Sequence, residues 1–148
     1  AATAASAKLR TGGTTPDAIP SPDHVMRFMA TCVEEGIPMK ATAGLHHAIR
    51  GHYPLTYEPS SPTGLMFGYL NIFLGAAFCA AGSSSSAVLG ILEETDPSRF
   101  RVDDRGVWWE DHIVVHEELN VVRHAVATSF GSCSFTEPVG EARRLGLI

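Results

Sequence analysis

Basic residues, glycines and histidines gather in two short stretches of this sequence, residues 8–13 (KLRTGG) and residues 40–47 (KATAGLHH). Lysine and arginine attract a phosphate or a carboxylate, and glycine allows backbone amides to approach an anion closely. A histidine beside such an anion transfers protons near neutral pH. The two stretches therefore predict a site for a small anionic molecule, with acid–base chemistry next to it.

The predicted roles follow from side-chain chemistry. The expected catalytic residues are Lys40, His46 and His47. The expected ligand-binding residues are Lys8, Arg10, Gly12, Gly13, Thr42 and Gly44. A buried Lys40 is also a candidate for Schiff-base formation. Two alternatives stay open: the basic residues pair with buried carboxylates, or the first strand is an edge strand whose charges are solvated.

Three histidines, His46, His47 and His52, raise the question of a metal site. Adjacent histidines on a strand point in opposite directions, and no HxH or HExxH spacing occurs. We therefore expect no metal ion and no other cofactor.

Cys133 lies in a serine- and glycine-rich segment, residues 129–135 (SFGSCSF). A nucleophile elbow requires the spacing GxSxG, which is absent. A reactive thiol requires nearby positive charge, and the local sequence supplies none. We therefore interpret the segment as a turn that completes the site or caps the last helix, with Cys133 as a nucleophile the less favoured alternative.

The candidate residues need elements that hold them together. Residues 7–13 predict a strand that ends in a glycine turn, and Ser21 followed by Pro22 predicts the start of a helix. This helix ends at Gly36, and residues 39–44 predict a second strand. A strand, a helix and a strand with short connections form a βαβ unit with parallel strands. Alternation along the strands places the basic residues on one face and apolar residues on the other.

The remaining elements are predicted from periodicity and turn residues. Residues 45–60 indicate a long loop, and loops of this length are often functional. Ser61 and Pro62 predict the start of an apolar helix that ends near Ala81. The further elements are a short helix over residues 87–94, a β-hairpin over residues 100–109, a helix over residues 116–130 and a final helix over residues 137–145.

The order of elements predicts an α/β fold of parallel βαβ units with a small β-hairpin. The strands that contain Lys8 and Lys40 resemble each other, and their spacing suits one repeat of a (β/α) barrel or a doubly wound sheet. So few strands do not close an eight-stranded barrel. We therefore expect residues 1–148 to form a single α/β domain, either the C-terminal half of a larger barrel or a sheet completed in a homo-oligomer or by a missing N-terminal domain.

Composition limits the partners and the compartment. The chain has 148 residues and a formal net charge of -5, which disfavours nucleic acid because phosphate binding requires clustered Lys and Arg. The apolar segment 65–81 is at the lower length limit of a membrane span, and we expect a buried helix there and no membrane partner. The three cysteines show no CxxC spacing, and residues 1–7 lack the apolar core of a secretory signal. A cytoplasmic protein is the resulting expectation.

Three stretches taken together, KLRTGG, KATAGLHH and FGSCSFTEP, resemble the C-terminal half of an uncharacterised bacterial protein family with the motifs KxRTGG, KATAGLHH and FGSCSF. The resemblance covers most of the chain, although Ala48 stands where that family has a proline. Strands that end in lysine and glycine also resemble, more distantly, aldolase-like barrel enzymes. The resemblance implies a barrel-like fold and no particular reaction.

The expected function is an enzyme, or half of one, that acts on a small anionic metabolite. Lysine and histidine acid–base chemistry of this kind suits a lyase or an isomerase. The alternatives are a non-catalytic anion-binding module and a structural or oligomerisation module.

Overall fold

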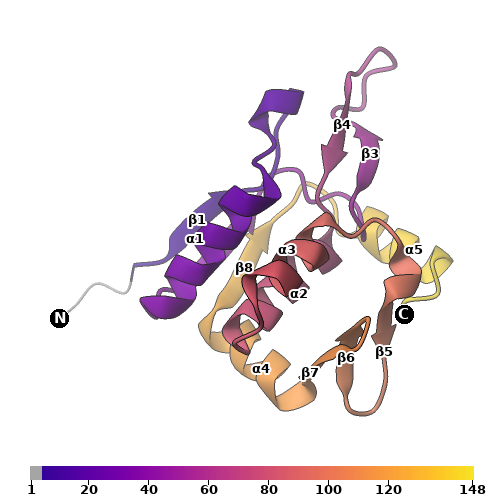
Figure 1. Ribbon diagram of the computed structural model, residues 1–148. Helices are drawn as coiled ribbons and strands as arrows, with labels where there is room; N and C mark the ends of the chain where they lie inside the picture. Colours follow the sequence, from indigo (N-terminus) through magenta and orange to yellow (C-terminus); the bar gives the residue numbers. More distant parts are fainter. Residues whose placement is uncertain (1–4) are drawn as a thin grey trace.

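A mixed α/β fold is seen in the computed structural model, which describes residues 5–148. The segment 1–7, in which we predicted no secretory signal, lies mostly outside this range. A parallel sheet, a two-stranded antiparallel ribbon and a three-stranded antiparallel sheet surround a core of buried helices (Figure 1). The predicted α/β class is confirmed at this level.

The predicted βαβ unit opens the chain. Strand β1 (Ala7–Arg10), helix α1 (Pro22–Glu34) and strand β2 (Met39–Thr42) follow one another, and β1 pairs with β2 in parallel. Ser21 caps α1, because its side-chain oxygen accepts a hydrogen bond from the backbone N–H of His24 at 3.2 Å. Local sequence therefore predicts this unit and the start of its helix correctly.

A third parallel strand is the main element that the sequence did not reveal. We predicted one helix over residues 116–130, but helix α4 (His116–Ala125) ends early and strand β8 (Ala127–Gly131) follows it. β8 pairs in parallel with β2, so the strand order is β1-β2-β8 and all three carboxyl ends lie at one edge. The helical prediction is wrong because apolar spacing continues toward β8, whereas the pairing partner of β8 is distant in sequence. The sheet is open, and across residues 5–148 no closed barrel forms.

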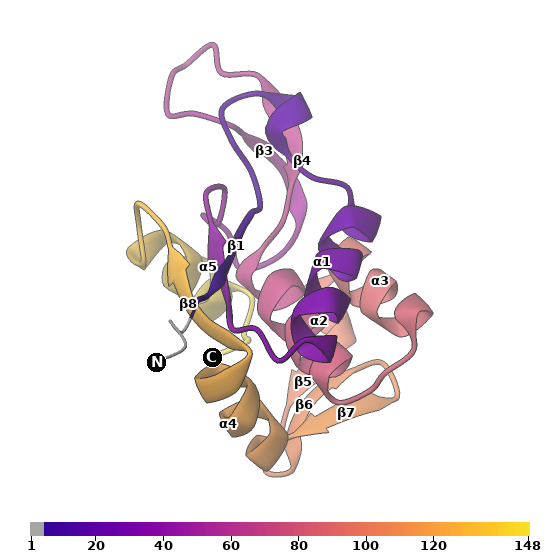
Figure 2. The same ribbon diagram turned by 90° about the vertical axis from the view of Figure 1, so that its left-hand side faces the viewer.

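Helices cover one face of the parallel sheet. α1, α2 (Tyr69–Ala80) and α3 (Ser85–Glu93) lie on the same side of it (Figure 2). Leu9, Met39 and Ala41 are buried on this side, in the common core. Parallel sheets are usually covered on both faces, so the basic residues on the opposite face call for an explanation.

An antiparallel ribbon replaces the predicted long loop and helix start. β3 (Gly51–Pro54) pairs with β4 (Thr63–Met66), and the ribbon projects from the body of the molecule (Figure 1). α2 begins only at Tyr69 and not near the predicted start at Ser61. Ser61 instead accepts a hydrogen bond from the backbone N–H of Thr56 within the turn of the ribbon. Its helix-start pattern is therefore used for a turn, which explains the wrong prediction.

One polar residue organises the apolar helix α2. Asn71 is fully buried, and its Oδ1 atom accepts hydrogen bonds from the backbone N–H groups of Arg50 (2.8 Å) and Gly68 (3.2 Å). Its Nδ2 group donates to the backbone carbonyls of Ile91 and Glu94, each at 2.8 Å. Asn71 thereby connects α2 to α3 and to the segment before β3. In the described part of the chain, no helix has the length and apolar character needed to cross a membrane.

The predicted β-hairpin is confirmed and extended by one strand. β5 (Phe100–Val102), β6 (Gly106–Trp109) and β7 (His112–Val115) form an antiparallel sheet, which follows the 3-10 helix η2 (Pro97–Arg99). The final helix, α5 (Thr136–Arg144), agrees with the predicted one to within about a residue at each end. α5 follows the carboxyl end of β8 and so borders the edge where the three parallel strands end.

Candidate functional site

The face of the parallel sheet opposite the helices carries two rows of residues. Each row contains one residue from each of the three strands, and the residues of a row are register partners. The residues of this open face are Lys8, Lys40 and Ser129 in one row and Arg10, Thr42 and Gly131 in the next. Leu9 and Ala41 point the opposite way and are buried. The predicted division of the strands into a basic face and an apolar face is confirmed.

The positive charges on the open face have no acidic partner among residues 5–148. Lys8 and Arg10 are exposed, and Lys40 is half-buried. Across residues 5–148, none of the three forms an ion pair. Lys8 and Lys40 are the only lysines in the sequence, and they are register partners on neighbouring strands. Like charges placed opposite each other destabilise a sheet, so a bound anion would relieve a repulsion that the fold leaves in place.

Lys40 extends toward the carboxyl end of β8. A Cβ atom added to Gly131 would lie 3.6 Å from Cε and 3.9 Å from Nζ of Lys40, and 3.2 Å from Oγ1 of Thr42. Gly131 therefore leaves room for the lysine side chain over the end of the strand. The ammonium group lies beside the segment that leads into Cys133.

The glycines predicted to bind an anion pack closely in this structure. A Cβ atom on Gly12 would lie 2.8 Å from Cα of Gly44, and Gly44 has a φ of +75°. Gly13 lies against Ala18 of η1 (Pro16–Ala18), where an added Cβ would come within 2.6 Å of the alanine side chain. The three glycines are therefore required for close approach of the chain at this edge. Contact between their amides and an anion stays a prediction.

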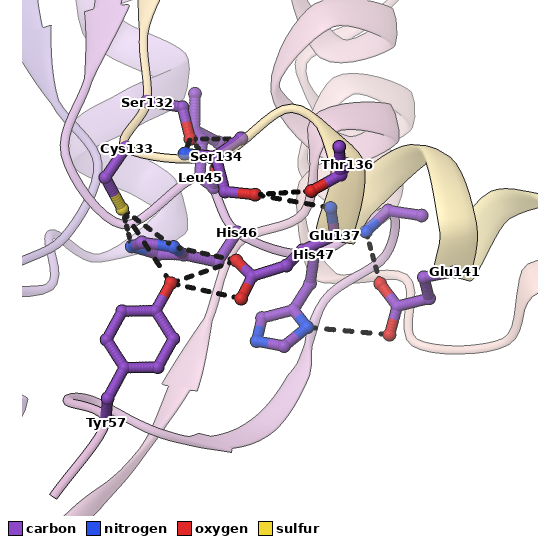
Figure 3. Close-up of polar contacts among 11 residues, drawn as sticks. Leu45, His46, His47, Tyr57, Ser132, Cys133, Ser134, Thr136, Glu137 and Glu141 are labelled. Carbon is purple, nitrogen blue, oxygen red and sulfur yellow. Dashed lines mark hydrogen bonds and ion pairs between the residues drawn. The ribbon is translucent and has the colours of Figure 1, made fainter.

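His46 follows β2 and meets side chains from distant parts of the chain (Figure 3). The Sγ atom of Cys133 lies 3.3 Å from Nδ1 and 3.6 Å from Nε2 of the His46 ring. A carboxylate oxygen of Glu137 lies 3.6 Å from Nδ1. A thiol, an imidazole and a carboxylate thus lie together, and these are group types used in nucleophilic and acid–base catalysis.

Tyr57 joins this group from the loop between β3 and β4. Its hydroxyl lies 3.1 and 3.0 Å from the two carboxylate oxygens of Glu137 and 4.0 Å from Sγ of Cys133. The hydrogen bond to Glu137 raises the pKa of Tyr57 to about 12, so the hydroxyl stays protonated and acts as a donor to the carboxylate. We call His46, Tyr57, Cys133 and Glu137 the His46 cluster.

A serine-rich turn presents Cys133 to His46. Ser132 donates a hydrogen bond from Oγ to the backbone carbonyl of Leu45 at 2.7 Å, which ties the end of β8 to the segment after β2. Ser134 accepts a hydrogen bond through Oγ from the backbone N–H of Glu137 in the first turn of α5. Ser134 thus contacts the first turn of α5, whereas the N-cap residue Phe135 makes no side-chain cap hydrogen bond. Cys133 is exposed, and its thiol points toward the His46 ring (Figure 3).

His47 lies in a different environment from its neighbour. Its ring stacks on Tyr53 with the centroids 3.3 Å apart, and its Nδ1 atom lies 3.5 Å from Oε1 of Glu141. Burial lowers the pKa of His47, although the charge and hydrogen bond of Glu141 act in the opposite direction. Glu141 also accepts a hydrogen bond from the backbone N–H of Ala48. His47 is thus held by packing, whereas His46 faces a thiol.

The third histidine considered for a metal site, His52, lies exposed on β3. Across residues 5–148, no three His, Cys, Asp or Glu side chains are arranged to hold a metal ion. The groups that contact His46 and His47 are the protein's own thiol, carboxylate and tyrosine groups.

Sequence reasoning missed several residues that the fold brings to this edge. Tyr57, Glu137 and Glu141 were not among the candidates, and Cys133 was the less favoured alternative for its segment. They meet the two histidines because β8 is parallel to β2, a pairing that no local pattern predicts. One sequence signal for a third parallel strand was present: β8 ends in a glycine, and the other two parallel strands are also followed by glycines.

Comparison with known proteins does not identify this site. No family model, no curated protein and no solved structure matches the sequence. The assignment of a function therefore depends on the open face and the His46 cluster.

Proposed function

We propose that the chain is an enzyme, or part of one, that acts on a small anionic substrate at the carboxyl edge of the parallel sheet. The observation that carries the proposal is the open face, where the two lysines are adjacent and, within the described residues 5–148, form no ion pair in a protein of net charge -5. Active sites of α/β proteins lie at the carboxyl ends of parallel strands, which is where His46 lies. Lys8, Arg10 and Lys40 bind a phosphate or carboxylate in this proposal.

The proposed chemistry uses His46 as a base and the positively charged side chains of the open face. His46 removes or returns a proton next to the anionic group of the substrate. The ammonium group of Lys40 stabilises negative charge as it develops in the transition state. Proton transfer beside a stabilised anion is the common step of many lyases and isomerases, so these reaction types suit the site. His47 positions the loop after β2 in this scheme, because its ring is packed on Tyr53.

Thermal unfolding with added anions tests this proposal. The melting temperature is measured against inorganic phosphate and succinate at constant ionic strength. A ligand that binds the native state raises the melting temperature in a saturable way, by roughly the equivalent of 2.7 kcal/mol at a hundred times its Kd. We expect this rise in the wild type and its loss in Lys40→Ala.

The matched control is Arg27→Ala, which removes one positive charge from an exposed position on α1. It should keep the full anion effect. A flat response in the folded wild type, or an equal response in Lys40→Ala, would contradict the anion site. It would favour the alternative in which Lys8 and Arg10 are solvated charges on an edge strand.

A second candidate function is a structural module that associates through β8. An apolar groove of about 880 Å³ runs along β8 between α2, α4 and α5, and Phe130 and Phe135 are exposed beside it. We propose a second copy of the chain as the occupant, which would extend the open sheet toward the barrel-like arrangement expected from the sequence. Sedimentation of the wild type and of Phe130→Ser checks this candidate. A wild type that stays monomeric at high concentration would exclude it.

A further inference from the structure

We propose that Cys133 is a covalent nucleophile and that His46 is the base that activates it. The inference deepens the proposed function, on which it rests for an anionic substrate; the proton that His46 moves is here that of the Cys133 thiol, and the reaction is acyl transfer to water in place of a lyase or isomerase step. It names a second catalytic group and a substrate class: a small molecule that carries both a negative charge and an acyl group, such as a thioester, an ester or an amide.

Geometry provides the first argument. Both ring nitrogens of His46 are within 3.6 Å of the Cys133 sulfur, and Nδ1 also lies 3.6 Å from a Glu137 oxygen. Nδ1 is the ring nitrogen nearer to the sulfur, at 3.3 Å, so it takes the thiol proton, and the Glu137 carboxylate 3.6 Å from the same atom stabilises the protonated ring. A nucleophile, a base and a group that orients the base form the arrangement that activates serine and cysteine nucleophiles. Tyr57 holds the Glu137 carboxylate through its hydroxyl.

The position of the sulfur provides the second argument. Cys133 lies just before the nine-residue helix α5, and the amino end of a helix favours a nearby negative charge. The side chain of Lys40 reaches the end of β8, two residues earlier in the chain. Cys133 is also the exposed cysteine of the chain, whereas Cys32 is buried and Cys79 is partly covered. A reagent or substrate therefore reaches this sulfur most easily.

The proposed reaction has two steps. In the first, His46 takes the proton from Cys133, the sulfur attacks the carbonyl carbon and a C–S bond forms. The bond from this carbon to the leaving group then breaks, and the leaving group takes the proton from His46, which leaves an acyl thioester on Cys133. In the second, His46 takes a proton from water, the water oxygen attacks the same carbon, and the C–S bond breaks. The sulfur recovers the proton, and the product is a carboxylic acid.

Alkylation with a neutral and an anionic reagent tests this inference. Iodoacetamide and iodoacetate both form an S–C bond and release iodide, but only iodoacetate carries a negative charge. Rates at pH 7 are measured by peptide mass mapping, with Cys32 and Cys79 as internal controls. Burial raises the pKa of both of these thiols, so they should react slowly. We expect iodoacetamide to modify Cys133 about tenfold faster in the native chain than in the denatured chain.

Variants separate the two parts of the inference. His46→Asn should slow alkylation of Cys133 by both reagents, by about tenfold or more. Lys40→Ala should slow iodoacetate more than iodoacetamide, by roughly a further threefold, because it also removes a charge that attracts the anionic reagent. His46→Gln repeats the first test with a different side chain, and the native-to-denatured comparison needs no variant.

Each outcome bears on a different proposal. Equal reaction rates for Cys133 in the native and denatured chain would overturn the nucleophile. An iodoacetate rate that Lys40→Ala slows more than the iodoacetamide rate would, even then, leave the anion site supported. Fast modification by iodoacetamide with no effect of Lys40→Ala on iodoacetate would support the nucleophile and overturn the anionic substrate.

Discussion

Charged residues are used in opposite ways in the β5–β6 hairpin and on the open face of the parallel sheet. In the hairpin, Asp103 accepts a hydrogen bond from the Trp108 indole at 2.8 Å and forms an ion pair with Arg101. The indole hydrogen bond is the main cause that lowers the pKa of Asp103 to about 2. On the open face, Lys8 and Lys40 are adjacent and, across residues 5–148, have no acidic partner.

The difference separates charges that maintain the fold from charges that are left for a ligand. The partners of Asp103 are close to it in the sequence, so the hairpin satisfies its charges as it forms. The lysines of the open face come from two strands joined by a helix, and the fold places them together with no counter-charge among the described residues. Removing a charge should therefore destabilise the hairpin and stabilise the open face.

The largest effect is expected where Gly12 and Gly44 pack closely at the edge at which the parallel strands end. Gly44→Ala should lower the free energy of unfolding by about 3 kcal/mol, because the new Cβ lies 2.7 Å from Cα of Gly12 in a left-handed conformation. Gly36→Ala is the control, since Gly36 has a similar φ of +62° but no neighbour within 4 Å. Gly36→Ala should lower the free energy of unfolding, measured by urea denaturation, by about 1 kcal/mol. Equal losses would show that this edge adapts to added volume.

The stability that the ionised Asp103 gives to the hairpin should be lost in acid. Because the folded pKa of Asp103 is about 2, below the ordinary value for aspartate, its stabilising effect is complete above about pH 4 and is lost as the pH falls toward 2. Asp103→Asn should be less stable than the wild type at pH 5, and the difference should shrink at pH 2. Urea midpoints at the two pH values give this comparison. Asp104→Asn, at the next position, is the control and should behave like the wild type at both.

A charge reversal on the open face should act in the other direction. Lys8→Glu replaces a like-charge neighbour of Lys40 by an opposite charge, so the free energy of unfolding should rise by about 0.5 kcal/mol. The gain should be greatest at low salt, because residue 8 is exposed and salt screens its interaction with Lys40. The same variant should lose the phosphate-dependent rise in melting temperature. A less stable variant would contradict the repulsion that distinguishes this face from the hairpin.

The smallest effect is expected at His47, the packed histidine between these two extremes. Its folded pKa lies below the ordinary value, chiefly through burial, so the neutral ring stabilises the fold above about pH 6.5. This stabilisation is lost as the pH falls below that value. The melting temperature of the wild type should therefore decrease more between pH 7.5 and 5.5 than that of His47→Asn. An equal decrease would indicate that Glu141 fully offsets the effect of burial, and a smaller decrease in the wild type would indicate that Glu141 outweighs it.

The βαβ unit was predictable because its signals are local. The Ser21 cap, the glycine that follows α1 and the alternation along β1 and β2 each depend on residues within a few positions of one another. The basic character of one strand face followed directly from that alternation. These are the parts of the fold and of the site that sequence reasoning obtained.

The remaining elements depend on partners that are far away along the chain. β8 was predicted as helix because its short sequence pairs only with β2, and β4 was predicted as helix because its partner β3 lies across a turn-rich loop. Tyr57 and Glu137 reach His46 only through these pairings. A pattern read along a single segment carries no information about such neighbours, so the thiol near His46 was underestimated.

The distance along the chain between His46 and Cys133 has a consequence for folding kinetics. The two residues are 87 positions apart, and they meet only after β8 has docked beside β2. Long-range parallel pairing is slow, because loop-closure entropy opposes it before any contact is made. During refolding, helices such as α1 should form first and the sulfur–imidazole contact should form late. The rate at which the Cys133 thiol reacts during refolding would then report when the native state is complete.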